Sequence, residues 1–345
     1  MKRDIRSLSL KELISFFELN NYPAYKANQV YDWLWKKSCF SFEKMTNISL
    51  KLRERLKDEF VINHIKIDKI QKSNDGTIKN AVMLFDNHIV ESVLIPVKNR
   101  TTACVSSQVG CSLDCNFCAT SKLKRMRNLN ADEIYDQVST IDIQSKLYYN
   151  RPISNIVFMG MGEPLLNYKN LILGITKITS PEGLGISPKR ITISTSGISR
   201  LILKLADEKI KFNLAISLHS AIEETRNKIM PFSKKFPLTE LLDAVKYWNK
   251  KTGSQVTYEY IVWDQINDNV EHINALINFC KASDAKVNII EYNEIDNLLF
   301  KPASEDKIQQ YVRSLKKSRI PVTIRKSRGN DIDAACGQLA NKLIS

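Results

Sequence analysis

The sequence predicts an α/β protein whose main body is a partial parallel β/α barrel, preceded by a small helical domain and a β-hairpin. Three observations support this fold class. Helical spacing of apolar residues fills the first 60 residues, strand-like and helical patterns alternate beyond residue 100, and polar tails follow most of the strand-like runs. We therefore expect an N-terminal accessory domain over residues 1–60, a hairpin extension over 61–97 and the barrel over 98–345.

The accessory domain is expected to contain three amphipathic helices. Apolar residues follow helical spacing in SLKELISFFEL and in YKANQVYDWLW, and SLKLRERLKDEF adds a third such segment. The pattern then changes to alternation, and two alternating runs flank Asp75-Gly76, a dipeptide typical of tight hairpin turns. We interpret this hairpin, with the strand-like run IVESVLIP after it, as a β extension that joins the two bodies.

Six apolar runs after residue 150 are expected to be parallel strands of the barrel. They are residues 155–159, 190–194, 212–217, 256–262, 286–291 and 321–325, and the helical patterns among them cover 132–149, 168–179, 239–250, 270–283 and 304–317. With the cysteine-containing segment that precedes them, these runs make six to seven strands, too few for a closed eight-stranded barrel. We therefore expect a partial barrel of the (β/α)6 type.

Polar or glycine-containing tails follow five of the strand-like runs. They are GMGEP after the first run, TSG after the second, LHS after the third, YNE after the fifth and KSRG after the sixth. The carboxyl ends of parallel strands meet at one mouth of a barrel, which is where the active sites of such barrels lie. The five tails are therefore expected to share one site.

The chain is strongly basic, with 51 Lys and Arg against 37 Asp and Glu and a formal net charge of +14. This charge indicates an anionic partner. Because the basic residues interleave with apolar ones, nucleic acid fits better than a membrane surface. The N-terminus carries charges where a secretory signal needs an apolar run, and no stretch approaches the roughly 18 apolar residues of a membrane span. We therefore expect a cytoplasmic protein.

Four of the seven cysteines lie within the stretch CVSSQVGCSLDCNFC. The total of seven is odd, and three of the cysteines lie too close together for a mutual disulfide framework, which favours a reducing compartment with metal or catalytic thiols. Cys111, Cys115 and Cys118 are spaced C-x3-C-x2-C and suit a soft metal centre, either zinc or iron–sulfur. A closed zinc site requires a further Cys or His, and none of the histidines is paired for that role; they are His64, His88, His219 and His272. The fourth cysteine, Cys104, remains to be explained.

The motif, with Phe117 directly before its last cysteine, resembles the signature of the radical S-adenosylmethionine (SAM) superfamily, whose fold is a partial β/α barrel. The resemblance implies one [4Fe–4S] cluster on Cys111, Cys115 and Cys118, with SAM chelated at the open iron and cleaved to a 5′-deoxyadenosyl radical. It also assigns SAM contacts to the strand-end tails. These contacts are Gly162 and Glu163 in GMGEP, Ser194 in ISTSG, Ser217, Leu218 and His219 in SLHS, and Asn293 in EYN.

A second resemblance is more specific and runs from about residue 94 to residue 339. RKSRGNDIDAACGQLA and CVSSQVGC resemble the RlmN-type methyltransferases, which methylate carbon 2 of adenine in 23S rRNA and in certain tRNAs. The resemblance implies that one SAM methylates Cys336, and that a second SAM yields the radical that activates this methyl group for addition to adenine. It places Glu91 as the base that removes the ring proton. Cys104 would then release the RNA through a transient disulfide with Cys336.

The same family implies 23S rRNA and tRNA as partners, an electron donor such as flavodoxin, and a monomer. The basic segments SKLKRMRNLN and KKSRIPVTIRKSRG are expected to contact phosphates on either side of the barrel mouth. The disulfide step also sets a geometric requirement. The Cα atoms of Cys104 and Cys336 must approach within about 7 Å during turnover.

Some alternatives stay open. A strand cysteine such as Cys104 is often a small buried hydrophobe, and Glu91 on an alternating strand is by default a solvent-facing residue. A related family methylates carbon 8 of the same rRNA adenine, although GMGEP and STSG favour the carbon-2 group. A non-catalytic RNA-binding protein with a structural metal would leave Cys336 and Glu91 without a purpose. One departure from the family is EYNEIDN, where Glu291 and Glu294 replace prolines.

Overall fold

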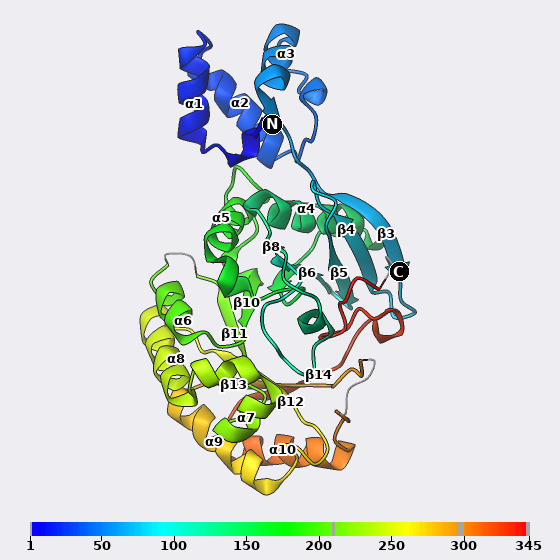
Figure 1. Ribbon diagram of the computed structural model, residues 1–345, viewed down its shortest axis with the longest axis vertical. Coiled ribbons are helices and arrows are strands. Elements are labelled where there is room, and N and C mark those ends of the chain that lie inside the picture. Colours follow the sequence, from blue (N-terminus) through cyan, green and yellow to red (C-terminus); the bar gives the residue numbers. More distant parts are fainter. Residues whose placement is uncertain (1, 209–210, 296–299, 343–345) are drawn as a thin grey trace.

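The computed structural model describes residues 2–208, 211–295 and 300–342 and shows a helical module at one end of a larger α/β body (Figure 1). The module contains α1 (Leu10–Leu19), α2 (Ala24–Trp35) and α3 (Leu50–Glu59), which are the three helices that the apolar spacing predicts. β1 (Arg3–Asp4) pairs in parallel with β2 (Phe60–Val61), a contact that the sequence does not predict. The module therefore begins and ends at the same place, next to the barrel.

A buried arginine fixes the module against the barrel. Arg6 Nη1 lies 2.7 Å from Asp136 Oδ1, and Arg6 Nη2 lies 3.1 Å from Asp132 Oδ2, both on α4 (Ala131–Tyr149). The Tyr135 ring packs edge-on against Trp35 at 5.1 Å between centroids, and its hydroxyl donates a hydrogen bond to the Trp35 carbonyl. These contacts bury the side chains on both sides, so the two bodies are packed together.

Replacing Arg6 with methionine is expected to lower the free energy of unfolding by about 3–5 kcal/mol, because it leaves the fully buried Asp136 carboxylate without its cation. Thermal unfolding and limited proteolysis between the module and the barrel measure this effect. Arg3→Met is the matched control, since Arg3 pairs with Glu12 at 3.8 Å on the surface and should matter little. Equal behaviour of the two variants would show that Arg6 does not hold the module.

One ten-stranded sheet forms the body, in the order β14-β13-β12-β11-β10-β9-β6-β5-β4-β3. Its parallel strands fall where the apolar runs predict them. They are β6 (Arg100–Cys104), β9 (Asn155–Phe158), β10 (Ile191–Thr195), β11 (Asn213–Ser217), β12 (Thr257–Ile261), β13 (Lys286–Ile290) and β14 (Val322–Arg325). An open row of parallel strands covered by helices confirms the partial barrel.

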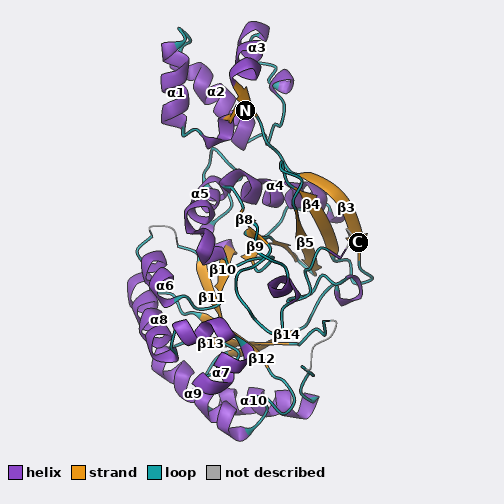
Figure 2. Ribbon diagram, viewed as in Figure 1, coloured by secondary structure: helices purple, strands orange, loops and turns teal. Residues whose placement is uncertain are grey.

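Helices cover the outer face of this sheet (Figure 2). Five of them match the predicted segments, namely α4, α5 (Tyr168–Thr179), α8 (Leu238–Thr252), α9 (Val270–Ser283) and α10 (Glu305–Lys317). Two short helices, α6 (Ser199–Ala206) and α7 (Glu223–Ile229), were not predicted, because about two turns give too little periodicity to recognise. None of the helices in the described residues has both the length and the apolar character that crossing a membrane requires.

The predicted hairpin is present, but it is not a linker between two bodies. β3 (Lys66–Lys72), β4 (Ile78–Met83) and β5 (Ile89–Val97) are antiparallel, and β5 pairs with β6, so they prolong the barrel sheet. The turn between β3 and β4 contains Gly76 at φ +88°, a left-handed conformation that suits glycine. Figure 1 shows these strands beside the C-terminal segment, whose residues 340–341 bond to β5. They therefore belong to the wall of the barrel.

Candidate functional site

Two cavities meet inside the barrel. The first, the cysteine cavity, has a volume of about 150 Å³ and lies at the carboxyl ends of the strands; its lining includes Cys111, Cys115, Cys118, Gly160, Gly162, Glu163, Ser194, Ser217 and His219. The second, the barrel cavity, has a volume of about 580 Å³, and its lining extends to the residues that begin the strands, such as Arg100, Asn155, Asn213 and Lys286. Five residues line both cavities: Met159, Glu259, Ile290, Arg325 and Cys336.

The barrel cavity has an unusually polar wall. Side chains alternate across a strand, so the residues at every second position of each strand face the interior. Those positions include Thr102, Asn155, Thr192, Asn213, Thr257, Asn288 and Thr323. Closed eight-stranded barrels fill this space with branched apolar side chains. The polar wall and a volume typical of ligand pockets indicate that the interior receives a molecule.

The three cysteines lie on one loop that enters the cysteine cavity. Short pairing of β7 (Gln108–Val109) with β8 (Arg127–Asn128) closes this loop at its base. Burial raises the pKa of all three thiols, that of Cys111 to about 11. Within the described residues no three His, Cys, Asp or Glu side chains lie close enough together to bind one metal ion. Three thiols lining one cavity do fit an iron–sulfur cluster, which takes each thiolate on a separate iron.

The GMGEP tail is held by the segment before the cluster loop. Gly162 has φ +93°, and a Cβ there would lie 2.5 Å from Cβ of Gln108, so only glycine fits. The amide of Glu163 donates to Gln108 Oε1 at 2.8 Å. The Glu163 carboxylate, itself buried, accepts from the amides of Ser196 at 2.8 Å and Leu165 at 3.0 Å. It thereby joins the tails of β9 and β10 into one rim.

The remaining predicted SAM contacts do not all face the cysteine cavity. Ser194, Ser217 and His219 line it. His219 Nδ1 accepts from the amide of Ile261 at 3.2 Å, and burial lowers the pKa of this histidine to about 3, so its ring is neutral. Leu218 packs in the hydrophobic core and lines neither cavity. Asn293 is buried, and its amide donates to the Cys336 carbonyl at 3.3 Å.

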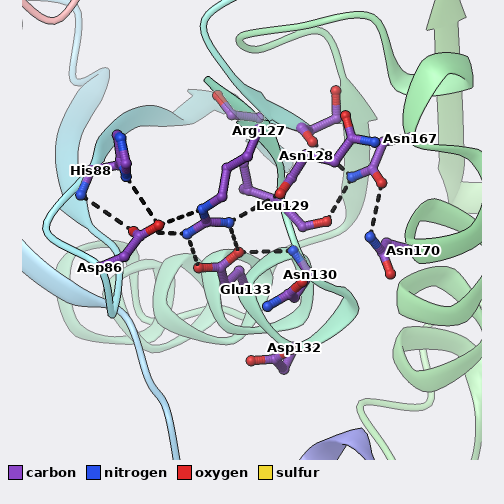
Figure 3. Close-up of polar contacts among 12 residues, drawn as sticks. Asp86, His88, Arg127, Asn128, Leu129, Asn130, Asp132, Glu133, Asn167 and Asn170 are labelled. Carbon is purple, nitrogen blue, oxygen red and sulfur yellow. Dashed lines mark hydrogen bonds and ion pairs between the residues drawn. The ribbon is translucent and has the colours of Figure 1, made fainter. Parts of the chain in front are cut away.

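Arg127, within the basic segment after the cluster loop, is bound by two carboxylates rather than free for RNA (Figure 3). Its Nε lies 2.6 Å from Asp86 Oδ2 and its Nη1 lies 2.7 Å from Glu133 Oε2. Glu133 also accepts from the amide of Asn130 at 2.8 Å, which caps α4. Arg127 therefore ties the β4–β5 turn to the start of α4. Its exposed neighbours Lys122, Lys124 and Arg125 remain candidates for phosphate contact.

The C-terminal segment brings Cys336 to the place where the cavities meet. On one side it is tied to the cluster loop, since the amide of Ala119 donates to the Gly337 carbonyl at 2.7 Å and the Thr120 hydroxyl donates to the Leu339 carbonyl at 2.6 Å. Cys336 and Cys104 are both free thiols. Cys104 lines the barrel cavity and is buried, and burial with nearby Cys336 raises its pKa to about 12.

On its other side the segment is tied to the β3–β4 turn. Asp331 accepts from the Ser73 hydroxyl at 2.6 Å and from the amide of Asn74 at 3.0 Å. The amide of Gly329 donates to Asp75 Oδ2 at 3.0 Å. The hairpin therefore anchors the segment that carries Cys336, a role that the sequence pattern did not suggest.

Glu91, the predicted base, lines neither cavity. Its side chain is fully buried, and Oε2 accepts from the amides of Ala340 at 2.8 Å and Asn341 at 3.1 Å. Oε1 lies 3.3 Å from Nζ of Lys79, which is also buried. The expectation of a solvent-facing glutamate is wrong for this strand position. The carboxylate must be released from residues 340–341 before it can reach a ring proton, so its role as a base stays a prediction.

Glu259 and Arg325 are further residues of the site. The sequence pattern places Arg325 only in the basic segment KKSRIPVTIRKSRG, as a candidate for phosphate contact, and does not single out Glu259. Both line the two cavities, and Arg325 Nη1 lies 3.2 Å from Sδ of Met159. The nearby Cys336 raises the pKa of Arg325, which therefore stays a cation beside the thiols. The available signal was a charged residue at an inward position of an otherwise apolar strand, as in VTYEYIV.

Comparisons with known proteins match almost the whole chain. The model of the ribosomal RNA large subunit methyltransferase N-terminal domain matches residues 3–62, and that of the radical SAM superfamily matches residues 105–280. A protein of Flavobacterium psychrophilum called probable dual-specificity RNA methyltransferase RlmN is 63% identical over 343 residues, with 99% of each chain covered. One of the same name from Cytophaga hutchinsonii is 52% identical over 341 residues, covering 99% of this chain and 93% of that one.

A solved structure is similar over its whole length. The crystal structure of a radical SAM methyltransferase from Sphaerobacter thermophilus has a TM-score of 0.92 and 34% identity, with 98% of this chain and 99% of that chain covered. The accessory domain and the barrel thus both lie within the length that these relatives match. The chain therefore belongs to the RlmN family of radical SAM methyltransferases.

Proposed function

We propose that this protein methylates carbon 2 of an adenine in 23S rRNA and in certain tRNAs, using Cys336 as the methyl carrier. The supporting observation is that Cys336 lines both the cysteine cavity and the barrel cavity. A thiol at this boundary can take a methyl group from a donor on one side and present it to a base on the other. Transfer of the methyl group through a thiol suits carbon 2 of adenine, because this carbon is electrophilic and cannot attack the SAM methyl directly.

The cysteine cavity is proposed as the site of the cofactors. Cys111, Cys115 and Cys118 would hold a [4Fe–4S] cluster, which supplies the electron that cleaves SAM. Five residues that line this cavity would bind SAM: Gly162, Glu163, Ser194, Ser217 and His219. Asn293, which lines neither cavity, would reach SAM from its place beside the Cys336 carbonyl. Leu218 would contribute through its backbone, because its side chain lies in the core.

The thiols are proposed to act in sequence. The Cys336 sulfur first bonds to the methyl carbon of one SAM as the carbon–sulfur bond of that SAM breaks. A deoxyadenosyl radical from a second SAM would take a hydrogen from this methyl group, and the resulting carbon radical would add to adenine. The adduct would give up one electron, for which the cluster held by Cys111, Cys115 and Cys118 is the acceptor that the proposal supplies. Glu91 is proposed to remove the ring proton. The Cys104 thiolate then attacks the Cys336 sulfur, and the bond between that sulfur and the transferred carbon breaks as the disulfide forms. The carbon keeps the electron pair of this bond and takes a proton, which completes the methyl group of the departing RNA.

Access for RNA is proposed at the barrel cavity, whose wall is polar and includes Arg100 and Lys286. The target base must leave its stack to reach Cys336. Exposed basic residues near the cluster loop, Lys122, Lys124 and Arg125, would contact phosphates. An electron donor such as flavodoxin and a cytoplasmic location complete the proposal.

The test is anaerobic reconstitution with iron and sulfide, then incubation with SAM, a reductant and an rRNA fragment, followed by mass spectrometry of the digested nucleosides. We expect 2-methyladenosine from the native protein and from Cys280→Ser, which alters a buried cysteine on α9. Cys336→Ser should give none. Appearance of 8-methyladenosine would overturn the carbon-2 assignment, and absence of any SAM-dependent product would overturn the enzymatic proposal.

A further inference from the structure

We propose that Glu259 recognises the target adenine by accepting a hydrogen bond from its exocyclic amino group. This inference rests on the proposed function and names a residue that reads the substrate. Glu259 lies on β12, where Thr257, Glu259 and Ile261 line the cavities. The alternate residues turn outward, as shown by the Tyr258 hydroxyl, which donates to Oγ of Ser283 on α9 at 2.9 Å.

Only one of the two oxygens of the Glu259 carboxylate has a hydrogen-bond partner among the described residues. Its side chain is buried, with 3% of the residue exposed, and Oε1 accepts from Nδ2 of Asn288 at 3.0 Å. Oε2 is buried and has no hydrogen-bond partner in the part of the chain that the structure describes. An unpaired buried carboxylate oxygen is costly, so its retention at a cavity wall indicates that a ligand supplies the missing donor.

The neighbours of Glu259 hold the carboxylate in a fixed orientation. The Thr323 hydroxyl donates to Oδ1 of Asn288, which leaves Nδ2 of Asn288 directed at Glu259. Burial raises the pKa of Glu259, while Arg325 on β14, which lines the same cavities, and the hydrogen bond from Asn288 act against this rise and favour the carboxylate. A preorganised acceptor of this kind can select for a donor at one position of the ligand.

The chemistry of the cavity favours the base over SAM as the partner. Asn288 and Thr323, which orient Glu259, line the barrel cavity and not the cysteine cavity. Adenine presents an amino donor at carbon 6, where guanine presents a carbonyl acceptor that a carboxylate would repel. Glu259 and Cys336 both lie at the boundary, so a base bound by Glu259 can lie next to the methyl carrier.

The test compares two RNA fragments that differ only at the target base, one with adenosine and one with purine riboside, which lacks the amino group. Native protein should methylate the adenosine fragment about 10- to 100-fold more efficiently, the range for a hydrogen bond to a charged group. In Glu259→Met this ratio should fall by that factor. Comparing variants cancels the different intrinsic reactivity of the two bases. Glu259→Gln keeps one acceptor oxygen and should give an intermediate ratio.

Methylation of Cys336 without RNA, measured by mass spectrometry of the protein, separates the alternatives. Methylation of Cys336 should persist in the Glu259→Met variant. Loss of Cys336 methylation in both Glu259→Met and Glu259→Gln would place Glu259 in the SAM site and overturn the inference. An unchanged ratio in either variant would also overturn it. Glu271→Met, which alters an exposed carboxylate on α9, is the control and should keep the native ratio. Absence of a methylated base with native protein would instead count against the proposed function itself.

Discussion

Replacing Cys104 with alanine is expected to stop turnover at a covalent adduct between Cys336 and RNA. Cys104 and Cys336 are both free thiols that line the barrel cavity, so Cys104 lies on the side where the methylated base would be attached. Without Cys104 the carbon–sulfur bond to the base should persist, because the other thiols that share a cavity with Cys336 are the proposed cluster ligands Cys111, Cys115 and Cys118. Denaturing gels should show a shifted protein–RNA band, and mass spectrometry should assign the crosslink to Cys336.

Cys280→Ala is the control for Cys104→Ala, because it removes another buried cysteine and should release RNA normally.

The rate at which the native protein releases RNA should also depend on pH. Burial raises the pKa of Cys104 to about 12, and only the thiolate attacks. Below that pKa, the single-turnover release rate should therefore rise with pH, by roughly tenfold per unit. Normal turnover by Cys104→Ala would remove Cys104 from the mechanism.

Replacing Glu91 with glutamine is expected to lower the rate of RNA methylation by about 100-fold or more, since 100-fold is the lower end of what a general base typically contributes. The structure adds a second consequence. Glu91 and Lys79 form a buried ion pair at 3.3 Å, so Glu91→Gln leaves a buried ammonium without its anion. Stability should fall by about 3–5 kcal/mol, measured by chemical denaturation.

The double variant Lys79→Met, Glu91→Gln separates the two roles of Glu91. Removing both charges should restore most of the lost stability, because a buried ion pair can be replaced by neutral groups of similar size. Methylation should stay low, since glutamine accepts no proton. Recovery of methylation would show that Glu91 only holds residues 340–341 in place. The proton acceptor would then be another group, and Glu259 is the carboxylate already at the cavity boundary.

Local patterns in the sequence were sufficient for most of the fold. The strand of residues 286–290 lies inside the predicted run 286–291, and α9 begins and ends at the predicted residues. Apolar periodicity predicts such elements because each side of a strand or helix meets one environment over its whole length. The hairpin turn at Asp75-Gly76 was likewise predictable, because the required backbone conformation restricts the residue types.

The role of the hairpin could not be predicted in this way. The alternating pattern suggests a linker, yet in the structure its turn binds Asp331, 258 positions away from Ser73. Arg127 shows the same limit, because its charge suggested RNA contact while Asp86, 41 positions away, already pairs with it. Partners this distant leave no periodic signal in the sequence.

The sequence by itself determined the three-cysteine loop, the order of the strands and the resemblance that names Cys104, Cys336 and Glu91. These features depend on residues that are neighbours in the chain. Only the tertiary structure decided that Cys336 lies between two cavities, that Glu259 presents an unpaired oxygen there, and that Glu91 is covered by Ala340, 249 positions later. Burial and the choice of partner are set by packing between distant segments, and that packing decides which of the candidate groups meet.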